Sequence, residues 1–288
     1  MTTTSVAPSR RLLSVHGVQF NAELREPAGS PGGTLTLIHG FTGSAAGWGA
    51  HLDTFAAVGL RAIALDMLGH GASDLPDDPA RYAMGLCRDD ILAALAQLGI
   101  GAGESALLGY SMGGRIALYT ALSGYFSALI LESASPGLAT EAERAARRAS
   151  DAALAQRIER DGVPAFVDEW ERLPLFASQQ LLPAERRDAL RAQRLHNRAA
   201  GLANSLRGIG TGAQPSLWDD LPRLSIPTLL IAGALDTKYA AIARQMAERL
   251  PHAQLTVVPN AGHAPHVEQP TMFDELVTDF CLEQAHAT

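Results

Sequence analysis

Short apolar runs alternate with helix-like stretches along most of this 288-residue chain, and this alternation constrains the fold more than any other feature. The apolar runs have the continuous hydrophobicity of strands in a parallel sheet covered on both faces; they are TLTLIHG, RAIALDM, SALLGY, SALILES, PTLLIAG and AQLTVVPN. The stretches between them have helical periodicity, as in CRDDILAALAQLG and YAAIARQMAERLP. Strands that alternate with helices predict a right-handed, three-layer α/β fold with a mostly parallel sheet.

The chain is organised around one interruption of this alternation. At the N-terminus, LLSVHGVQF and AELREP (residues 12–20 and 22–27) predict an opening pair of strands. Later, three helical stretches follow one another with no strand between them, so we expect a helical cap over residues 136–217. The cap is inserted between residues 1–135 and 218–288, which form the core. A chain of this length that is 47% hydrophobic fits one large core with such an insertion.

The composition argues against several classes of protein. A net charge of −7 and a pI near 5.7, without a cluster of Lys and Arg, do not fit a nucleic-acid partner. The sequence has no stretch of roughly eighteen apolar residues, so we expect a cytoplasmic protein without membrane insertion. Cys87 and Cys281 stand far apart and outside any metal-ligand spacing, which favours buried, reduced thiols without a catalytic role.

The run SALLGY leads into Gly109-Tyr110-Ser111-Met112-Gly113, which fits the pattern G-x-S-x-G at a strand-to-helix junction. In such a nucleophile elbow the glycines are needed because a Cβ at either position would strike the neighbouring strand and helix. The turn holds the Ser111 hydroxyl above the sheet, at a helix N-terminus whose dipole favours developing negative charge. Ser111 is therefore the candidate catalytic serine; the alternative is an ordinary N-cap after a buried strand.

A catalytic serine needs an imidazole to take its proton and a carboxylate to fix the tautomer of that imidazole. In the chain order serine, acid, histidine, the acid follows a late strand, and PTLLIAGALDTKY supplies Asp236. The histidine follows the last strand, where LTVVPNAGHAPHVEQP supplies His263. Glu132, at the end of SALILES, is an alternative acid, and His266 is expected to pack on the following helix.

A loop after an early strand, LIHGFTGSAAGW, completes the candidate site. The backbone N–H groups of Phe41 and Met112 are expected to form an oxyanion hole. We interpret His39 as a support for this loop rather than an acid or base. Asp66, in LDMLGHGASD, is interpreted as a turn-building residue.

These motifs resemble the α/β-hydrolase superfamily over the chain from Leu12 to about Glu283. Within it, the segments HGFTGSAAGW, LLGYSMGGRIAL, LILESASPGL, ERAARRASD, PLFAS and PNAGHAPHVEQP resemble the 2-succinyl-6-hydroxy-2,4-cyclohexadiene-1-carboxylate (SHCHC) synthases of menaquinone biosynthesis. The resemblance implies a lyase that eliminates pyruvate from 2-succinyl-5-enolpyruvyl-6-hydroxy-3-cyclohexene-1-carboxylate. It implies no cofactor, because proton transfer and elimination need only an acid/base relay and an anion hole.

The same resemblance implies where the substrate binds. The substrate carries three carboxylates, which guanidinium groups pair with better than ammonium groups do. Arg115 matches the family motif GYSMGGR, in which Tyr110 also lies, and the family is expected to place two further arginines and an aromatic wall in the cap. These cap residues correspond to Arg147, Arg194 and Trp170. An alignment shifted within the cap would bring in Arg148, Arg191 or Arg198 instead.

Two other functions stay open on the sequence. A hydrolase that cleaves an ester or a carbon–carbon bond would use the same serine, acid and histidine, and only the arginines disfavour it. A binding protein without catalysis could share the fold, although it would have no need to keep all three residues.

Overall fold

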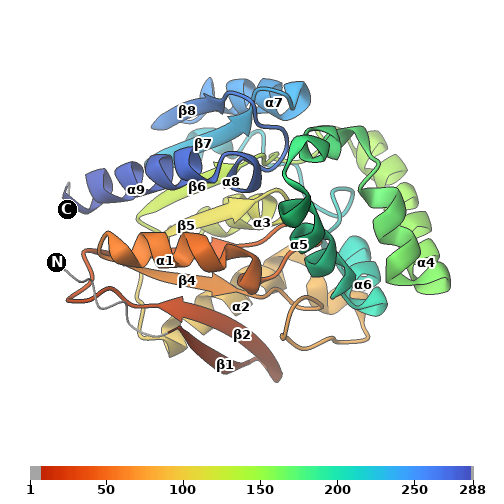
Figure 1. The fold of residues 1–288 in the computed structure, drawn as a ribbon, viewed down its shortest axis with the longest axis horizontal. Helices are drawn as coiled ribbons and strands as arrows, with labels where there is room; N and C mark the ends of the chain where they lie inside the picture. The colour runs from red at the N-terminus through yellow and green to blue at the C-terminus, as the bar shows by residue number, and fades with distance from the viewer. Residues whose placement is uncertain (1–7, 287–288) are drawn as a thin grey trace.

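The computed structural model describes residues 8–286, which form an eight-stranded sheet in the order β1-β2-β4-β3-β5-β6-β7-β8 (Figure 1). β1 pairs with β2 and β2 with β4 in antiparallel fashion, and all other neighbours are parallel, so the predicted sheet is confirmed. The strands are β1 (Ser9–Val15), β2 (Val18–Arg25), β3 (Gly33–Ile38), β4 (Leu60–Leu65), β5 (Ser105–Tyr110), β6 (Ala128–Glu132), β7 (Thr228–Gly233) and β8 (Ala253–Val258). The expected core ranges also include residues 1–7 and 287–288, which lie outside the described residues.

The chain reverses its direction of travel across the sheet at β3. β4 follows β3 on one side, whereas β5 pairs with β3 on the other side. In open α/β sheets, ligands bind at the carboxyl ends of the strands at such a switch point. The loops that begin after Ile38 and Tyr110 therefore define the expected place of a site.

The opening pair of strands differs from the expectation. β1 and β2 form a hairpin whose turn lies inside the run LLSVHGVQF, at His16 and Gly17. Both turn residues have positive φ, 46° and 82°, as a two-residue hairpin turn requires. The expected strand over residues 12–20 was therefore wrong, because His-Gly is a less obvious turn signal than Asn-Gly.

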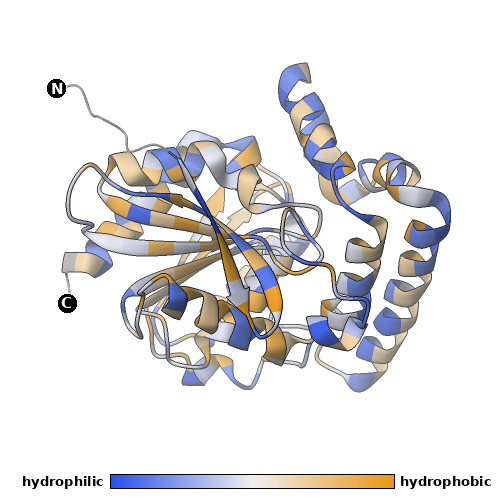
Figure 2. Cartoon of the chain, turned by 90° about the horizontal axis from the view of Figure 1, so that it is seen from below, coloured by the Kyte–Doolittle hydropathy of each residue, from blue (hydrophilic) through white to orange (hydrophobic). Residues whose placement is uncertain are grey.

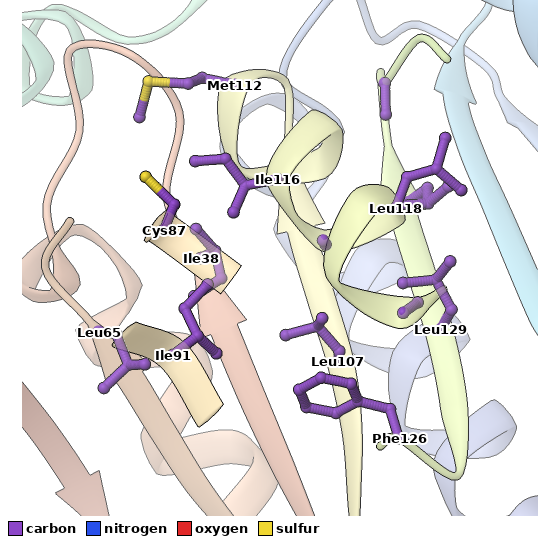
Figure 3. Close-up of a cluster of buried hydrophobic side chains, with 14 of the residues drawn as sticks. Ile38, Leu65, Cys87, Ile91, Leu107, Met112, Ile116, Leu118, Phe126 and Leu129 are labelled. Atoms are coloured by element: carbon purple, nitrogen blue, oxygen red, sulfur yellow. The ribbon is translucent and has the colours of Figure 1, made fainter. Parts of the chain in front are cut away.

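Helices cover both faces of the sheet. α2 (Met84–Gln97), α3 (Met112–Ala121) and α7 (Thr237–Ala247) pack on one face. Figure 3 shows Ile91 of α2 beside Ile38 of β3 and Leu65 of β4, in the same apolar cluster as Ile116 of α3. On the other face, α1 (Gly49–Ala57) contributes Leu52 and α9 (Pro270–His286) contributes Phe273. Figure 2 shows the matching hydropathy, with apolar residues concentrated in the strands. The two apolar clusters fix the sheet between its helix layers.

Five helical elements lie between β6 and β7, the last of which is the short 3₁₀ helix η4 (Leu221–Arg223). We call the first four the helical segment: α4 (Glu141–Trp170), the 3₁₀ helix η3 (Pro174–Leu181), α5 (Ala184–Leu195) and α6 (Ala199–Ile209). They stand to one side of the sheet in Figure 1, and α4 packs on α6 through the apolar cluster that includes Ile158 and Leu202. α4 is broken at Gly162, whose φ of 83° and ψ of 168° are not helical, just before Pro164. The expected separation of two helical stretches at this point is thus present as a kink.

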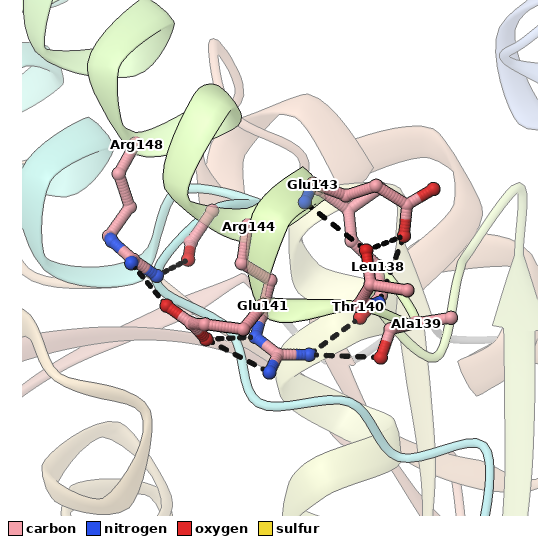
Figure 4. Close-up of polar contacts among 8 residues, drawn as sticks. Leu138, Ala139, Thr140, Glu141, Glu143, Arg144 and Arg148 are labelled. Carbon is pink, nitrogen blue, oxygen red and sulfur yellow. Dashed lines mark hydrogen bonds and ion pairs between the residues drawn. The ribbon is translucent and has the colours of Figure 1, made fainter.

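The start of α4 is defined by its cap. Thr140 and Glu143 form a reciprocal capping box, and Figure 4 shows it beside the ion pairs that Arg144 and Arg148 make with Glu141. These pairs are exposed, so they contribute little stability individually. Their importance is that they hold Arg148 at the surface.

Within residues 8–286, no helix combines the length and the hydrophobicity needed to cross a membrane. The short helix α8 (Pro265–Glu268) precedes α9 and follows the loop after β8.

Candidate active site

A cavity of about 970 Å³ lies at the carboxyl ends of the strands, between the sheet and the helical segment. It brings together every residue that the sequence indicated for the site, although those residues come from five separate parts of the chain. The cavity-lining candidates are Phe41, Tyr110, Ser111, Met112, Arg115, Arg147, Trp170, Arg194, Asp236 and His263.

Ser111 sits in the strained turn between β5 and α3. Its φ of 51° and ψ of −105° lie in a region that residues with a Cβ rarely adopt. A Cβ on Gly109 would collide with the carbonyl of Gly113, and a Cβ on Gly113 would collide with the carbonyl of Ile38. The glycines therefore let the elbow helix approach the sheet, as the sequence argument requires.

Ser111, His263 and Asp236 form a continuous hydrogen-bonded chain. The Ser111 Oγ lies 2.9 Å from His263 Nε2, and His263 Nδ1 lies 2.7 Å from Asp236 Oδ2. The other carboxylate oxygen of Asp236 accepts from the amide of Tyr239 at 3.1 Å, which orients the carboxylate. If Nδ1 donates to Asp236, Nε2 is left to accept the serine proton. His263 is 1% exposed, so this relay is shielded from bulk water.

Glu268 holds the backbone around the histidine, a role that the sequence did not indicate. Its carboxylate accepts hydrogen bonds from the amides of Gly262 at 2.7 Å and Ala264 at 3.2 Å. These two residues flank His263 in the chain. Glu268 is only 8% exposed, so the two amides are its main compensation for burial.

The alternative acid, Glu132, contacts a different histidine. Glu132 Oε1 lies 2.8 Å from His266 Nδ1 and accepts from the His266 amide at 2.8 Å. Asp236, not Glu132, is therefore the acid next to His263. His266 packs in α8 as expected, but it also lines the cavity, which the sequence did not reveal.

The two candidate oxyanion donors both belong to residues that line the cavity. Met112 is the first residue of α3, a position where the amide has no acceptor within the helix. Phe41 follows β3, and its carbonyl accepts from His70 Nε2 at 2.6 Å. Burial lowers the pKa of His70 to about 4, so a neutral ring supports this loop.

His39 and Asp66 have the supporting roles that the sequence indicated. His39 Nδ1 lies 2.7 Å from the Gly40 carbonyl, and His39 Nε2 accepts from the Met67 amide at 3.1 Å. Burial lowers the pKa of His39, which favours the neutral ring. Asp66 accepts from the Ala45 amide at 2.6 Å and so ties the same loop to the turn after β4.

Arg115 is a buried cation that faces the cavity without an acidic partner. Its Nη1 donates to the Ile209 carbonyl at 2.8 Å and to Gln214 Oε1 at 3.2 Å, both uncharged. No ion pair of Arg115 occurs within the part of the chain that the structure describes. Burial lowers its pKa to about 10, because loss of contact with water disfavours the charged guanidinium.

Two of the five candidate arginines in the helical segment and its connections line the cavity. Arg147 and Arg194 both line it, paired with Asp151 at 2.7 Å and with Glu171 at 3.1 Å respectively. The three alternatives do not line it and have other partners: Arg148 pairs with Glu141, Arg191 with Asp168, and Arg198 donates to the Ser73 carbonyl.

Lys238 adds a further cation at the cavity, and it is the single lysine of the whole sequence. Its side chain is exposed, and it stands two residues after Asp236 at the start of α7. Among the described residues that line the cavity, Asp236 is the one carboxylate against four cations. The lining is therefore suited to an anionic ligand.

Aromatic rings form one wall of the cavity. The Trp170 ring lies 5.5 Å from the rings of Phe41 and Phe176, with edge-on or tilted geometry. Tyr110 lies on the other side, with its ring 5.6 Å from that of His263. Across residues 8–286, no group of three or more His, Cys, Asp or Glu side chains is arranged to hold a metal ion.

The fold and this arrangement define the class of protein. Residues 37–276 match the alpha/beta hydrolase family, and the chain belongs to that family.

Its relatives narrow the comparison. A protein of Bacillus subtilis (strain 168) named "Putative 2-succinyl-6-hydroxy-2,4-cyclohexadiene-1-carboxylate synthase" is 44% identical over 248 residues, which cover 85% of this chain and 89% of that protein. The 2-succinyl-6-hydroxy-2,4-cyclohexadiene-1-carboxylate synthase of Salmonella paratyphi C (strain RKS4594) is 35% identical over 246 residues, covering 84% and 91%. The structure of MenH from S. aureus superposes with a TM-score of 0.87 at 35% identity, covering 91% of this chain and 98% of that one.

Proposed function

We propose that the chain is a lyase of menaquinone biosynthesis that converts 2-succinyl-5-enolpyruvyl-6-hydroxy-3-cyclohexene-1-carboxylate into SHCHC and pyruvate. The proposal is supported by the similarity of the chain to the SHCHC synthase of Salmonella paratyphi C and to MenH from S. aureus. It is carried above all by one observation: the buried Arg115 lines the same cavity as Ser111 and His263 and pairs with no carboxylate among residues 8–286.

The reaction begins with removal of a ring proton. The carbon that bears the succinyl group is acidic, because its neighbour is a ketone. His263 takes the Ser111 proton, and the serine oxygen takes the proton from carbon, with Asp236 stabilising the imidazolium that forms. The 2.9 Å and 2.7 Å contacts support this relay.

The negative charge then moves to the ketone oxygen. In this proposal the amides of Phe41 and Met112, which both line the cavity, receive this oxyanion. Electrons return through the ring double bond and break the bond from carbon to the enolpyruvyl oxygen. The departing enolpyruvate gains a proton and becomes pyruvate, and the ring keeps two conjugated double bonds.

Arginine side chains bind the three carboxylates in this proposal. Arg115 approaches from the elbow helix, and Arg147 and Arg194 approach from the helical segment, which we propose acts as a cap over residues 136–217. Trp170 and Tyr110 pack against the ring of the substrate. The proposal includes no cofactor and a cytoplasmic enzyme.

The deciding experiment follows the product. Freshly prepared enolpyruvyl substrate should yield pyruvate, measured with lactate dehydrogenase, at the rate at which the ultraviolet absorbance of the new diene rises. Both signals should disappear in Ser111→Ala.

A panel of p-nitrophenyl esters provides the comparison. Turnover should be weak, because a neutral ester leaves the arginines without an anion. Fast, saturable ester cleavage with no pyruvate above the spontaneous rate would instead indicate a hydrolase, and inertness toward both substrates would indicate a binding protein.

A further inference from the structure

A second histidine–carboxylate pair lies in the same cavity, beside the relay. Glu132 ends β6 and is completely buried, and His266 is the second residue of α8. Glu132 Oε1 receives both the amide and the Nδ1 of His266, each at 2.8 Å. The Nδ1 edge of the ring is thus turned toward the sheet, and within residues 8–286 Nε2 has no hydrogen-bond partner. His266 lines the cavity, so Nε2 is the ring nitrogen available to a ligand.

Glu132 has no other partner for its negative charge among the described residues. Its Oε2 is buried without a hydrogen-bond partner among the described residues, and no Arg or Lys pairs with it there. A buried carboxylate without a counter-charge is costly, and His266 is the group in position to balance it. A protonated His266 makes the pair neutral overall, and in that form both ring nitrogens donate. The pair then presents one N–H to the cavity.

Packing fixes the direction of that N–H. The His266 ring lies 4.7 Å from the ring of Trp48 and 4.6 Å from that of Tyr110. It comes from the sheet side of the cavity, whereas Arg115 contacts α6 and the loop after it. The two donors therefore belong to different parts of the cavity wall, His266 to α8 and Arg115 to α3, as suits a ligand with several carboxylates.

We infer that His266 is a further substrate-binding residue, whose Nε2–H donates to a carboxylate of the ligand while Glu132 supplies the charge that keeps it a donor. The inference deepens the proposed function, and it rests on that function only for the identity of the substrate. It assigns Glu132, the acid that the relay does not use, to binding instead of proton transfer.

The test compares Glu132→Gln with a matched control. Glutamine keeps the shape and can still accept from the His266 amide, but it removes the charge. The KM for the enolpyruvyl substrate should rise about tenfold with little change in kcat, because a charge-assisted hydrogen bond becomes an ordinary one in both ground and transition states. His266→Ala should match or exceed this effect. The control, His16→Asn, breaks another histidine–carboxylate pair, His16 with Asp90 at 2.9 Å, which does not line the cavity, so KM should stay unchanged.

Calorimetry with citrate as a tricarboxylate probe separates this inference from the proposed function. Citrate should bind the wild type and bind Glu132→Gln about tenfold more weakly, whether or not pyruvate is released. The inference is overturned if Glu132→Gln and His266→Ala bind citrate as His16→Asn does, or if the wild type does not bind citrate. A fall in kcat with unchanged KM and citrate affinity would also overturn it, since Glu132 would then act on the relay.

Discussion

Glu268 brackets His263 by accepting hydrogen bonds from the amides immediately before and after it in the chain. The imidazole is therefore held from two directions, by Asp236 at its ring and by Glu268 at its backbone. The loop after β8 gains a fixed position in this way, although it contains Gly262 and has no regular structure of its own.

Glu268→Gln should lower kcat on the order of tenfold with little change in KM. The amide side chain can accept only one of the two backbone hydrogen bonds, and its NH₂ group opposes the other, so His263 loses its alignment. Pyruvate release measures both constants, and the rate of labelling of Ser111 by a fluorophosphonate should fall in parallel. Glu275→Gln, an exposed change in the neighbouring helix α9, is the control. Equal behaviour of the two variants would mean that Glu268 only stabilises the loop.

Ser111→Ala and His263→Ala should each lower kcat roughly a thousandfold or more, and the double variant should be little worse than either. The reason is that each residue depends on the other for proton transfer, across the 2.9 Å contact between them. Initial rates of pyruvate release, corrected for spontaneous decay of the substrate, check this. Losses that multiply in the double variant would contradict a shared relay.

Arg115→Ala should raise KM or lower kcat/KM for the tricarboxylate. The loss should correspond to about 2–5 kcal/mol of binding free energy, because one carboxylate would lose its buried partner. Turnover of a small neutral ester should change little. Arg148→Ala provides the matched control, because it also removes an arginine, but one that pairs with Glu141 and does not line the cavity. If both arginine variants turn over the tricarboxylate equally well, Arg115 has no role in recognition.

Lys238→Glu should reduce kcat/KM for the tricarboxylate severalfold at low ionic strength, with a smaller reduction at high salt. An exposed cation at the cavity attracts an anion over a distance that salt screens. Arg223→Glu makes the same change in net charge at a site that does not line the cavity, with a side chain that is 77% exposed. A salt-independent effect, or an equal effect of Arg223→Glu, would contradict attraction by Lys238.

The sequence predicted best those features that depend on local order. Ser111 stands in a pentapeptide that fits one turn, and Asp236 and His263 each follow a strand by a few residues, so chain order and strand ends were enough to bring them together. The fold followed for the same reason, because buried parallel strands and their helices have patterns that can be read within a dozen residues.

Other features depend on contacts that no local pattern records. Glu132 and His266 are 134 residues apart, and nothing near either residue indicates the other. The turn at His16 and Gly17 was missed because the surrounding residues are apolar enough to form a continuous strand. The choice of Arg147 over Arg148 depends on which side of α4 faces the cavity, and this follows from packing against α6.

The two cysteines should be unreactive in the native protein. Cys87 and Cys281 are 2% and 6% exposed, and burial raises the pKa of each thiol to about 12. At pH 8 Ellman's reagent should therefore detect no thiol in the folded protein and both after denaturation with urea. Rapid reaction of either thiol in the folded state would show that it is accessible.

The same thiols make stability depend on pH in the alkaline range. In the unfolded chain they ionise near pH 9, whereas in the folded protein they hold their protons to about pH 12. Between these values the unfolded state binds fewer protons than the folded state. The thiols therefore make their full contribution to the free energy of unfolding below pH 9, and this contribution falls as the pH rises toward 12. Each thiol should contribute a slope of up to about 1.4 kcal/mol per pH unit. Urea midpoints from pH 8 to pH 11 check this, and Cys87→Ala and Cys281→Ala should each make the decline shallower. An unchanged decline in both variants would assign it to other groups.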